Sequence, residues 1–587
     1  MQEDRTKIVV FVVTIAFLLI LLRLAFLQLW SGKEYKRQAS NNCLKEDIIS
    51  APRGVIYTKD GKIIADNIAT YTIIIDSLSK LSASTRTYLT DIISPLYSKG
   101  YVPSSKKDTI KNAPLNIICK LEEQREQFPN LKVKAQPSRR YLYSKTFAHL
   151  IGYTGELSKK ELKNIKDKSS DKTYRLGGNI GKSGLEKQYE EFLKGKNGAR
   201  YIEVDARGRE LGLLSYDPPE PGYDTWLNID FDLQILADSI FTASNFSGCC
   251  VAMNPYTGEI LVWVSRPAFD PNLFSTSLTY NVWRQCIEDP SAPLYDRVLG
   301  TNPPGSVFKM VTAAAAIDLG KLHADTYQFV SCNGSMLIGN RTFNCWDVHG
   351  STNTVEAITV SCDVFFYQVG MNLGIEPLCS KARDVGFGKV TGVDIPRESK
   401  GFVPSEQWYK KKYGGIWGKG LVANLSIGQG EILVTPIQIL SVISGIATKG
   451  LIYTPRIVSK IVNSSGELIY STPAHYRALP FSQEAINVAR EGMLGAVNAP
   501  NGTARAAIIP EIQVAGKTGT AQNPHGTPHA WFTAFAPYEN PEICVVVLIE
   551  NGGHGGSIAA PIAKRIIQKY LSKQHPQTQP APPPEYN

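Results

Sequence analysis

One segment near the start of this chain, Ile8 to Trp30, is long and apolar enough to cross a membrane as a helix. No small-x-small cleavage site follows its apolar core, so we expect an uncleaved anchor rather than a removed signal peptide. Arg23 can reach the interface by snorkelling, and Trp30 is a typical interfacial aromatic. We expect a cytoplasmic tail (residues 1–7), one transmembrane helix (8–30) and a large remainder beyond it, although the charges on the two sides of the helix do not fix this orientation.

The remainder is too long for one hydrophobic core, since the chain has 587 residues. Hydrophobic residues make up 43% and charged residues 20% of the chain, which excludes wholesale disorder. The net charge of +10 forms no concentrated basic stripe, so nucleic-acid binding is disfavoured. The run Pro218 to Gly222 indicates a linker at 218–225 between domains at 31–217 and 226–573. Residues 574–587 are proline-rich, and we expect a disordered tail there.

The second domain has the pattern of a sheet covered by helices. Two buried strands, Cys249–Met253 and Ile260–Val264, flank a turn and form a predicted hairpin. Three strand-like runs return late in the chain, and helical sequence fills the region between. These late strands are Ile512–Ala515, His529–Phe535 and Ile543–Ile549, and helices are predicted at Asp232–Ala243 and Ala559–Leu571.

The stretch Pro303 to Lys309 combines a Gly-Pro turn with a serine and a lysine. Ser306 stands at the start of an apolar run that is closed by Gly320, as in a buried helix with a stop signal. Ser306 and Lys309 are three residues apart and share a helical face. A serine becomes a nucleophile when a base takes its proton, and a buried lysine beside another cation can be that base. Alone, the pair is better interpreted as a helix cap and a surface lysine, because chance matches to Ser-x-x-Lys are frequent in a long chain.

Two further motifs follow in a fixed order. Ser361-Cys362-Asp363 opens a second apolar helical run, and Lys517-Thr518-Gly519 stands at the end of a strand-like run. The trio Ser-x-x-Lys, Ser-Asp-Asn and Lys-Thr-Gly occurs in β-lactamases and penicillin-binding proteins. The chain resembles the class B penicillin-binding proteins, and most of all the members that act in rod-shape elongation.

Other stretches show the same resemblance. Arg53-Gly54, followed by the hairpin signal Asp60-Gly61, is similar to the start of the family's non-catalytic pedestal. Gly386-Phe387-Gly388 and Ser426 to Glu431 look like the family's sequence after the middle motif. The resemblance implies a multidomain protein: a membrane helix, a mixed α+β pedestal (dimerisation-type) domain with a head insert at about 71–173, and an α/β serine transpeptidase (β-lactamase-like) domain with a five-stranded antiparallel sheet flanked by helices. Short helices are predicted at Lys159–Lys168 and Lys187–Leu193.

The activity implied by the resemblance is that of a peptidoglycan D,D-transpeptidase of cell-wall elongation, a target of β-lactams with a possible carboxypeptidase side activity. Ser306 would attack the penultimate carbonyl of a stem peptide that ends in D-Ala-D-Ala, and an amine of a neighbouring stem would then take the acyl group. Lys309 is the expected base, and Ser361 would pass a proton between Lys309 and the leaving amine.

The third motif would recognise the substrate. Lys517 would supply a second positive charge that keeps Lys309 neutral and attracts the terminal carboxylate of the substrate. Thr518 and Thr520, on either side of Gly519, would hydrogen-bond that carboxylate. The backbone N–H groups of Ser306 and Thr520 would form the oxyanion hole.

The middle motif departs from the pattern, because Asp363 stands where the family trio has Asn. A carboxylate near Lys309 would favour its charged form and oppose its use as a base. Either Asp363 points elsewhere, for example toward a metal, or the base assignment shifts. Elongation-type relatives often have Asp at this position.

Three cysteines and a histidine are grouped around the middle motif: Cys332, Cys345, His349 and Cys362. Spacing alone leaves two readings open, a Cys332–Cys345 disulfide and a closed, structural Cys3His zinc site. Some elongation-type relatives have a metal site that uses a His and the Cys inside Ser-Cys-Asp, and His349 and Cys362 stand at matching positions. In those relatives the other ligands are carboxylates, so Asp347 is an alternative to Cys345. Catalysis needs no cofactor.

The expected partners also follow from the resemblance. Peptidoglycan stem peptides and β-lactams would bind the active site, and a SEDS-family glycosyltransferase (RodA-like) with other elongation-complex proteins would meet the anchor and pedestal. The protein would be a single-pass protein of the inner (cytoplasmic) membrane, with its bulk in the periplasm.

Several alternatives stay open. One is a β-lactam sensor or hydrolase of the same fold, although such proteins lack the long pedestal. Another is a division-type class B penicillin-binding protein. A scaffold with a dead active site is disfavoured, because Ser306, Lys309 and Lys517 are all present.

Overall fold

The computed structural model describes residues 2–30, 44–75, 82–94, 108–128, 131–168, 174–205, 210–275, 280–415, 417–524 and 526–575. The chain divides into two compact units, Met1–Pro52 with Gly195–Pro221, and Arg53–Lys194 with Gly222–Asn587. The tail predicted at 574–587 lies outside the described residues from 576 onward.

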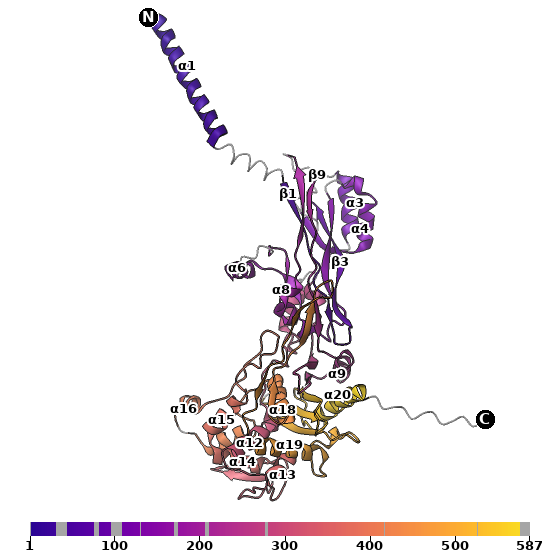
Figure 1. Ribbon diagram of the computed structural model, residues 1–587, viewed down its shortest axis with the longest axis vertical. Coiled ribbons are helices and arrows are strands. Elements are labelled where there is room, and N and C mark those ends of the chain that lie inside the picture. Colours follow the sequence, from indigo (N-terminus) through magenta and orange to yellow (C-terminus); the bar gives the residue numbers. More distant parts are fainter. Residues whose placement is uncertain are drawn as a thin grey trace, which may run out of the picture. The chain divides into compact units, whose positions relative to one another are not determined.

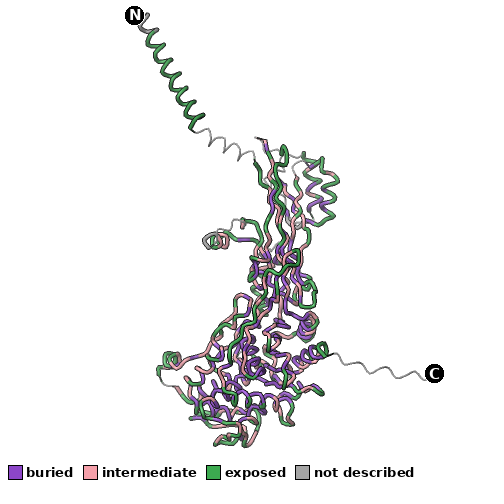
Figure 2. Tube along the Cα trace, in the orientation of Figure 1, coloured by how far each residue is buried: buried purple, intermediate pink, exposed green. Residues whose placement is uncertain are grey.

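The first unit contains the predicted apolar helix. Helix α1 (Gln2–Ala25) continues into a π-helical turn (Phe26–Trp30), and the stretch Lys7–Trp30 is long and apolar enough to cross a membrane. Its apolar side chains are exposed, as lipid contact requires (Figure 2). The same unit has a three-stranded antiparallel sheet in the order β1-β8-β9. Its strands are Leu44–Ile49, Gly198–Val204 and Glu210–Asp217.

The pedestal part of the second unit is built on a seven-stranded sheet (Figure 1). Its order is β17-β16-β10-β2-β3-β4, and β5 also pairs with β3. The predicted hairpin at Asp60-Gly61 joins β2 to β3, and Gly61 has the positive φ of 75° that such a turn requires. The strands are β2 (Ile56–Tyr57), β3 (Ile63–Ile75), β4 (Asp108–Ala113), β5 (Leu131–Tyr141), β10 (Asp224–Leu227), β16 (Val458–Val462) and β17 (Leu468–Ser471).

Short helices and a separate small core accompany this sheet. Helices α3 (Ala83–Ile93) and α4 (Leu115–Glu122) share a hydrophobic cluster with β3 and β4. Helix α6 (Lys159–Lys168) has the predicted bounds. The helix predicted at Lys187–Leu193 is instead two short helices, α7 (Gly184–Gln188) and α8 (Glu190–Leu193). The break falls at Tyr189, whose hydroxyl donates a 2.7 Å hydrogen bond to Asp394.

A buried ionic cluster ties the pedestal together. The carboxylate of Glu186 accepts from Arg53 at 3.0 Å and from Arg139 at 2.6 Å, and Arg53 also pairs with Glu190 at 2.7 Å. Both Arg139 and Glu186 are nearly inaccessible to solvent. Because Arg139 lies on β5, residues 71–173 supply part of the pedestal core as well as the head with α3 and α4.

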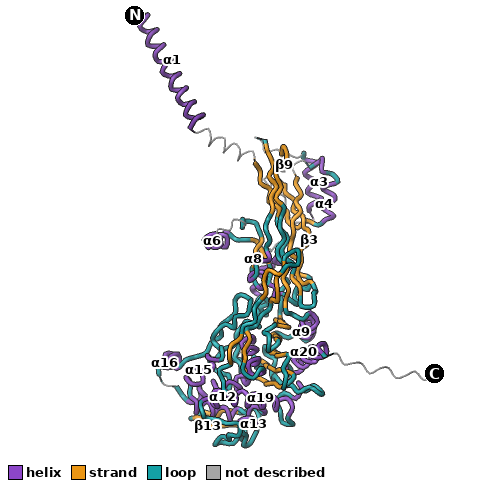
Figure 3. Tube along the Cα trace, in the orientation of Figure 1, coloured by secondary structure: helices purple, strands orange, loops and turns teal. Residues whose placement is uncertain are grey.

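The catalytic part contains the predicted five-stranded antiparallel sheet, in the order β12-β11-β21-β20-β19. Figure 3 shows strands and helices together in this part of the chain. Side chains alternate between its two faces, so Cys249 and Cys250 belong to different hydrophobic clusters. Helices α9 (Phe231–Ala243) and α20 (Ala559–Gln574) pack on the face of Cys250. Helices α12 (Lys309–Asp318) and α18 (Pro436–Ala447) belong to the cluster of Cys249. The strands are β11 (Gly248–Met253), β12 (Ile260–Arg266), β19 (Ala515–Ala521), β20 (His529–Ala536) and β21 (Ile543–Ile549).

Helices surround this sheet, with bounds close to those predicted at both ends of the domain. They are α5 (Ala148–Ile151), α9 (Phe231–Ala243), α10 (Asn272–Ser275), α11 (Tyr280–Glu288), α12 (Lys309–Asp318), α13 (Thr354–Thr359), α14 (Asp363–Leu373), α15 (Ile375–Asp384), α16 (Glu406–Tyr413), α17 (Lys419–Ser426), α18 (Pro436–Ala447), α19 (Gln483–Asn498) and α20 (Ala559–Gln574). Smaller strands form three pairs, β6 (Thr154–Glu156) with β7 (Asn179–Gly181), β13 (Ser335–Ile338) with β14 (Arg341–Asn344), and β15 (Leu451–Tyr453) with β18 (Tyr476–Ala478).

One strand prediction is wrong in its bounds. The strand expected at Ile512–Ala515 begins at Ala515, and Lys517-Thr518-Gly519 lies within it rather than after it. Residues Ala515 to Ala521 pair one for one with Phe535 to His529 of β20. Small residues that sequence patterns assign to a turn are held here as a strand by that pairing, which no local preference reveals.

Candidate active site

Ser306 lies in a tight turn at the entrance of a buried helix. A 3-10 turn (Gly305–Phe308) leads directly into α12, and Gly320 follows the helix with a φ of 65°, as predicted. Gly305 has a φ of 55°, and a Cβ there would lie 2.8 Å from the carbonyl oxygen of Thr520. Only glycine lets this turn approach β19 so closely. The cap position belongs to Pro304 and no side chain caps the turn, which removes the reading of Ser306 as a helix cap.

Lys309 is fully buried and is held by the middle motif. Its Nζ donates to the Ser361 carbonyl and to Asp363 Oδ1, both at 2.7 Å, and lies 3.3 Å from Ser361 Oγ. Asp363 therefore forms an ion pair with Lys309. Of the two alternatives for Asp363, the one in which it points elsewhere, for example toward a metal, is wrong, because α14 begins at this residue and directs its carboxylate to Lys309.

Ser361 is placed by an unusual backbone. Its φ of 56° lies in the left-handed region, which costs about 1–3 kcal/mol for a residue with a side chain. The strained residue stands between α13 and α14 and is almost buried. The sulfur of Cys362 accepts a hydrogen bond from Phe365 N at 3.4 Å and so caps α14. The surrounding helices thus hold the Ser361 hydroxyl between the side-chain amines of Lys309 and Lys517.

Lys517 is the second of these lysines. It is fully buried, and its Nζ lies 2.7 Å from Ser361 Oγ and 3.1 Å from the Thr518 carbonyl. Burial, and next the charge of Lys309, hold the pKa of Lys517 well below its ordinary value. From its sequence position Lys517 was expected to keep Lys309 neutral, whereas the lowered pKa in the structure is that of Lys517.

Strand β19 is the edge of the catalytic sheet, since β20 is its one neighbour in the order of the described strands. Thr518 is buried, and Thr520 is partly exposed. Gly519 faces the turn of Ser306, because a Cβ there would lie 3.3 Å from the Pro304 carbonyl. All three motifs are therefore brought together, with the third motif along one side of the Ser306 turn.

Three supporting residues were missed by sequence reasoning. The hydroxyl of Thr503 lies 2.9 Å from that of Thr518, and Gln429 donates to the Thr520 carbonyl at 3.2 Å. The indole of Trp531 donates to the Pro303 carbonyl at 3.1 Å. Gln429 belongs to a stretch that the resemblance had singled out, but Thr503 follows α19 in a turn without any sequence signal.

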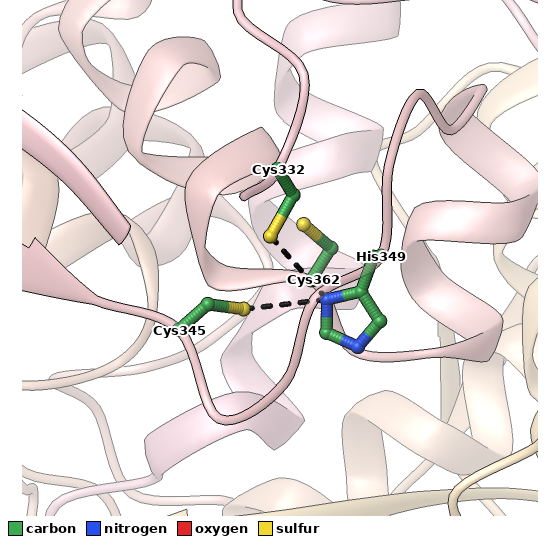
Figure 4. Close-up of side chains that lie close together, drawn as sticks. All are labelled: Cys332, Cys345, His349 and Cys362. Carbon is green, nitrogen blue, oxygen red and sulfur yellow. Dashed lines mark hydrogen bonds between the residues drawn. The ribbon is translucent and has the colours of Figure 1, made fainter. Parts of the chain in front are cut away.

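The four grouped metal-ligand residues lie together (Figure 4). The ligand atoms of Cys332, Cys345, His349 and Cys362 are all within 4.8 Å of one another. The nitrogen directed at the thiols is His349 Nδ1, 3.6 Å from Cys332 Sγ and 3.4 Å from Cys345 Sγ. Two ligands on a tetrahedral zinc with Zn–S of about 2.3 Å and Zn–N of about 2.0 Å stand about 3.5 Å apart. The donor set and its spacing fit a structural zinc.

The alternatives to this donor set are not supported. Cys332 and Cys345 are both free thiols, with no disulfide between them. Asp347 is exposed and lies outside the cluster, and its carboxylate accepts from the neighbouring Val348 N at 2.7 Å. Hydrogen bonding between Cys345 and Cys362 lowers the pKa of the Cys345 thiol and raises that of Cys362. Cys345 is therefore the thiol of this pair that ionises first.

Comparison with known proteins identifies the family. Residues 248–568 match the family described as "Penicillin binding protein transpeptidase domain", and residues 48–227 match the "Penicillin-binding Protein dimerisation domain". The chain belongs to the penicillin-binding proteins. Both domains expected from the resemblance are present in the expected order.

Individual relatives of this penicillin-binding protein agree with that assignment. It is 32% identical to the peptidoglycan D,D-transpeptidase MrdA of Haemophilus influenzae, over 94% of this chain and 89% of that protein. Its structure is similar to PBP2 of Helicobacter pylori in complex with MreC, with a TM-score of 0.77 and 28% identity, over 91% of this chain and 100% of that one.

A chain from a study of a peptidoglycan synthase complex that coordinates polymerization and crosslinking is also similar. Its TM-score is 0.72 and its identity 27%, over 96% of this chain and 98% of that one. The predicted family, the pedestal-and-transpeptidase fold and the enzyme class, a peptidoglycan D,D-transpeptidase of cell-wall elongation, are confirmed.

Proposed function

We propose that Ser306 is the nucleophile with which this transpeptidase cross-links stem peptides. The main support is the convergence of three motifs far apart in the sequence. Ser361 is 52 residues from Lys309 and 156 from Lys517, yet its hydroxyl contacts both amines. Ser306 lies on the turn that enters the same helix as Lys309 and that packs against the strand of Lys517.

The proton of Ser306 passes to Lys309, one helical turn further along the chain, as Lys309 gives up a proton through the Ser361 hydroxyl to the neutral amine of Lys517. Lys309, Ser361 and Lys517 form one network, so the base of the reaction is the pair of lysines rather than either alone. Burial, and next the charge of Lys309, lower the pKa of Lys517, so two ammonium groups around one hydroxyl are disfavoured. Ser361 then passes the proton to the leaving D-Ala amine. Asp363 orients Lys309 through their ion pair.

The substrate lies along the free edge of β19. An extended peptide can pair with an edge strand through its main chain, which places its scissile carbonyl beside the turn of Ser306. The backbone N–H groups of Ser306 and Thr520 form the oxyanion hole. Thr518 and Thr520 bind the terminal carboxylate, and Thr503 and Gln429 hold this part of the strand in place.

Zinc is the proposed occupant of the cluster of Cys332, Cys345, His349 and Cys362. Bound there, the metal would be closed off by protein ligands and would supply structural stability rather than chemistry. Cys362 connects the cluster to the catalytic site, because it caps α14 between Ser361 and Asp363. The metal would thus fix the start of the helix that positions Ser361.

Location and partners follow from the anchor and the relatives. The apolar helix α1 holds the protein in the inner membrane, with the catalytic domain in the periplasm where its substrate is. The Helicobacter relative binds MreC, and another similar chain belongs to a peptidoglycan synthase complex. We infer that this chain joins an elongation complex with a SEDS-family (RodA-like) glycosyltransferase, and that β-lactams acylate the same serine as the substrate.

Intact-mass measurement with a penicillin tests the nucleophile. The wild-type chain should gain one penicilloyl group, and Ser306→Ala should gain none. Ser239→Ala is the matched control, because this exposed serine donates its hydroxyl hydrogen bond to the Leu236 carbonyl of its own helix. An adduct on Ser306→Ala would refute the assignment. Rapid loss of the adduct from the wild type would favour the alternative of a β-lactam hydrolase.

A further inference from the structure

A cavity with a volume of about 520 Å³ lies between the pedestal and catalytic parts of the second unit. None of the proposed catalytic residues lines it. Its size is within the range of small-molecule sites, about 300–1,000 Å³. Four aromatic rings contribute to its walls, those of Tyr153, Phe269, Trp283 and Tyr295.

Two polar side chains at this cavity have no hydrogen-bond partner among the described residues. The Ser183 hydroxyl oxygen is shielded from solvent and has no hydrogen-bond partner among the described residues. A buried hydroxyl without a partner is unfavourable, so its presence at a cavity requires an explanation. The guanidinium of Arg397, an exposed residue at the same cavity, makes no hydrogen bond or ion pair within the described parts of the chain.

The inner part of the cavity presents hydrogen-bond acceptors. His149 Nε2 lies 3.3 Å from the Pro267 carbonyl, so this nitrogen bears the proton and Nδ1 is an acceptor. Burial lowers the pKa of His149, which keeps the ring neutral. The Asp296 carboxylate accepts from Trp263 Nε1 at 3.1 Å and from Val298 N at 3.0 Å. An anionic group of a ligand is therefore favoured beside Arg397, and a donor beside His149 and Asp296.

We propose that this cavity binds a small carboxylate that has an apolar body and an N–H donor, the chemistry of an N-acylated amino acid. The carboxylate pairs with Arg397, the apolar body lies among the aromatic rings, and the N–H group faces His149. The Ser183 hydroxyl turns toward the ligand and gains the hydrogen bond that it lacks. This site is separate from Ser306, so the proposal does not depend on the catalytic roles given above.

Calorimetric titration of the full chain in lipid nanodiscs tests the site with two probes, N-acetyltryptophan and its amide. The acid should bind about tenfold more tightly than the amide, because only the acid offers a charged partner to Arg397. Arg397→Gln should abolish this preference. Lys400→Gln, which removes an exposed cation three residues away, should retain it. Equal affinities of acid and amide for the wild type, or an unchanged preference in Arg397→Gln, would overturn the proposal.

A second variant tests the unpartnered hydroxyl. Ser183→Ala should raise the melting temperature of the ligand-free protein, because it removes a buried group without a partner. The same change should weaken binding of N-acetyltryptophan severalfold. A lower melting temperature, or unchanged affinity for the acid, would show that Ser183 has another partner and would contradict the site.

Discussion

The side-chain nitrogen of Lys517 lies 2.7 Å from the hydroxyl oxygen of Ser361, closer than Lys309, which lies 3.3 Å from the same atom. Ser361 is therefore shared by two buried amines that come from opposite ends of the catalytic domain. A hydroxyl can accept from one amine while it donates to the other, so a proton can cross this bridge without a large movement.

The pH dependence of acylation should reveal this pair. A neutral amine is needed to take the Ser306 proton, so the acylation rate should rise with pH as the pair loses its first proton. The charge of Asp363 raises the pKa of Lys517 against burial and Lys309. Asp363→Asn should therefore move the rising limb of the profile to lower pH. Stopped-flow acylation by a reporter β-lactam measures it, and a limb that stays in place or moves to higher pH would contradict the shared base.

Thr503 should act on substrate binding through Thr518. Thr503→Val keeps the shape but removes the hydroxyl that lies 2.9 Å from Thr518 Oγ1. Loss of one such hydrogen bond should weaken the complex that precedes acylation about tenfold, with a much smaller effect on the acylation step itself. Thr503→Ser should restore binding. If valine and serine variants behave alike, Thr503 has only a packing role.

Metal analysis decides the nature of the cysteine cluster. One zinc per chain is expected, and it should be lost in His349→Ala but retained in Cys119→Ser, whose thiol is exposed and outside the cluster. Chelation should lower the melting temperature, because metal binding stabilises the folded state. It should also slow acylation, since Cys362 caps the helix that positions Ser361. A protein without metal but with two thiols fewer than expected would instead indicate a disulfide.

The buried ionic cluster of the pedestal should be a major source of stability. Glu186→Gln leaves the cations of Arg53 and Arg139 without their shared carboxylate, and breaking such a pair costs about 3–5 kcal/mol. The melting temperature should fall clearly. The control Glu288→Gln breaks an exposed pair with Arg284 and should have little effect. Equal melting temperatures for the two variants would show that the cluster contributes nothing net.

Much of the fold follows from local sequence pattern. The alternation of Cys249 and Cys250, the stop at Gly320 and the hairpin at Asp60-Gly61 rest on local rules, and the structure agrees with each. The bounds of β19 were not predictable, because Gly516 and Gly519 have no strand preference and are held by pairing with β20.

The candidate site was predictable in its residues but not in its electrostatics. The order of the motifs identified Ser306, Lys309 and Lys517, whereas the contact of Asp363 with Lys309 depends on where α14 begins in space. Thr503 was out of reach for the same reason, since its role exists only through its distance to Thr518. The lowered pKa of Lys517 comes first from its burial, and burial is a property of the packed chain.

The pairing of β10 with β2 on one side and β16 on the other has a mechanical consequence. Strand β16 comes from the catalytic region of the sequence, whereas β2 belongs to the pedestal, so rows of backbone hydrogen bonds join the two parts directly. A force on the pedestal would act on these rows of backbone hydrogen bonds in shear, whereas a flexible linker would only be stretched. We therefore expect the catalytic part to rotate together with the pedestal. A partner that tilts the pedestal would then change the orientation of Ser306 without contacting it.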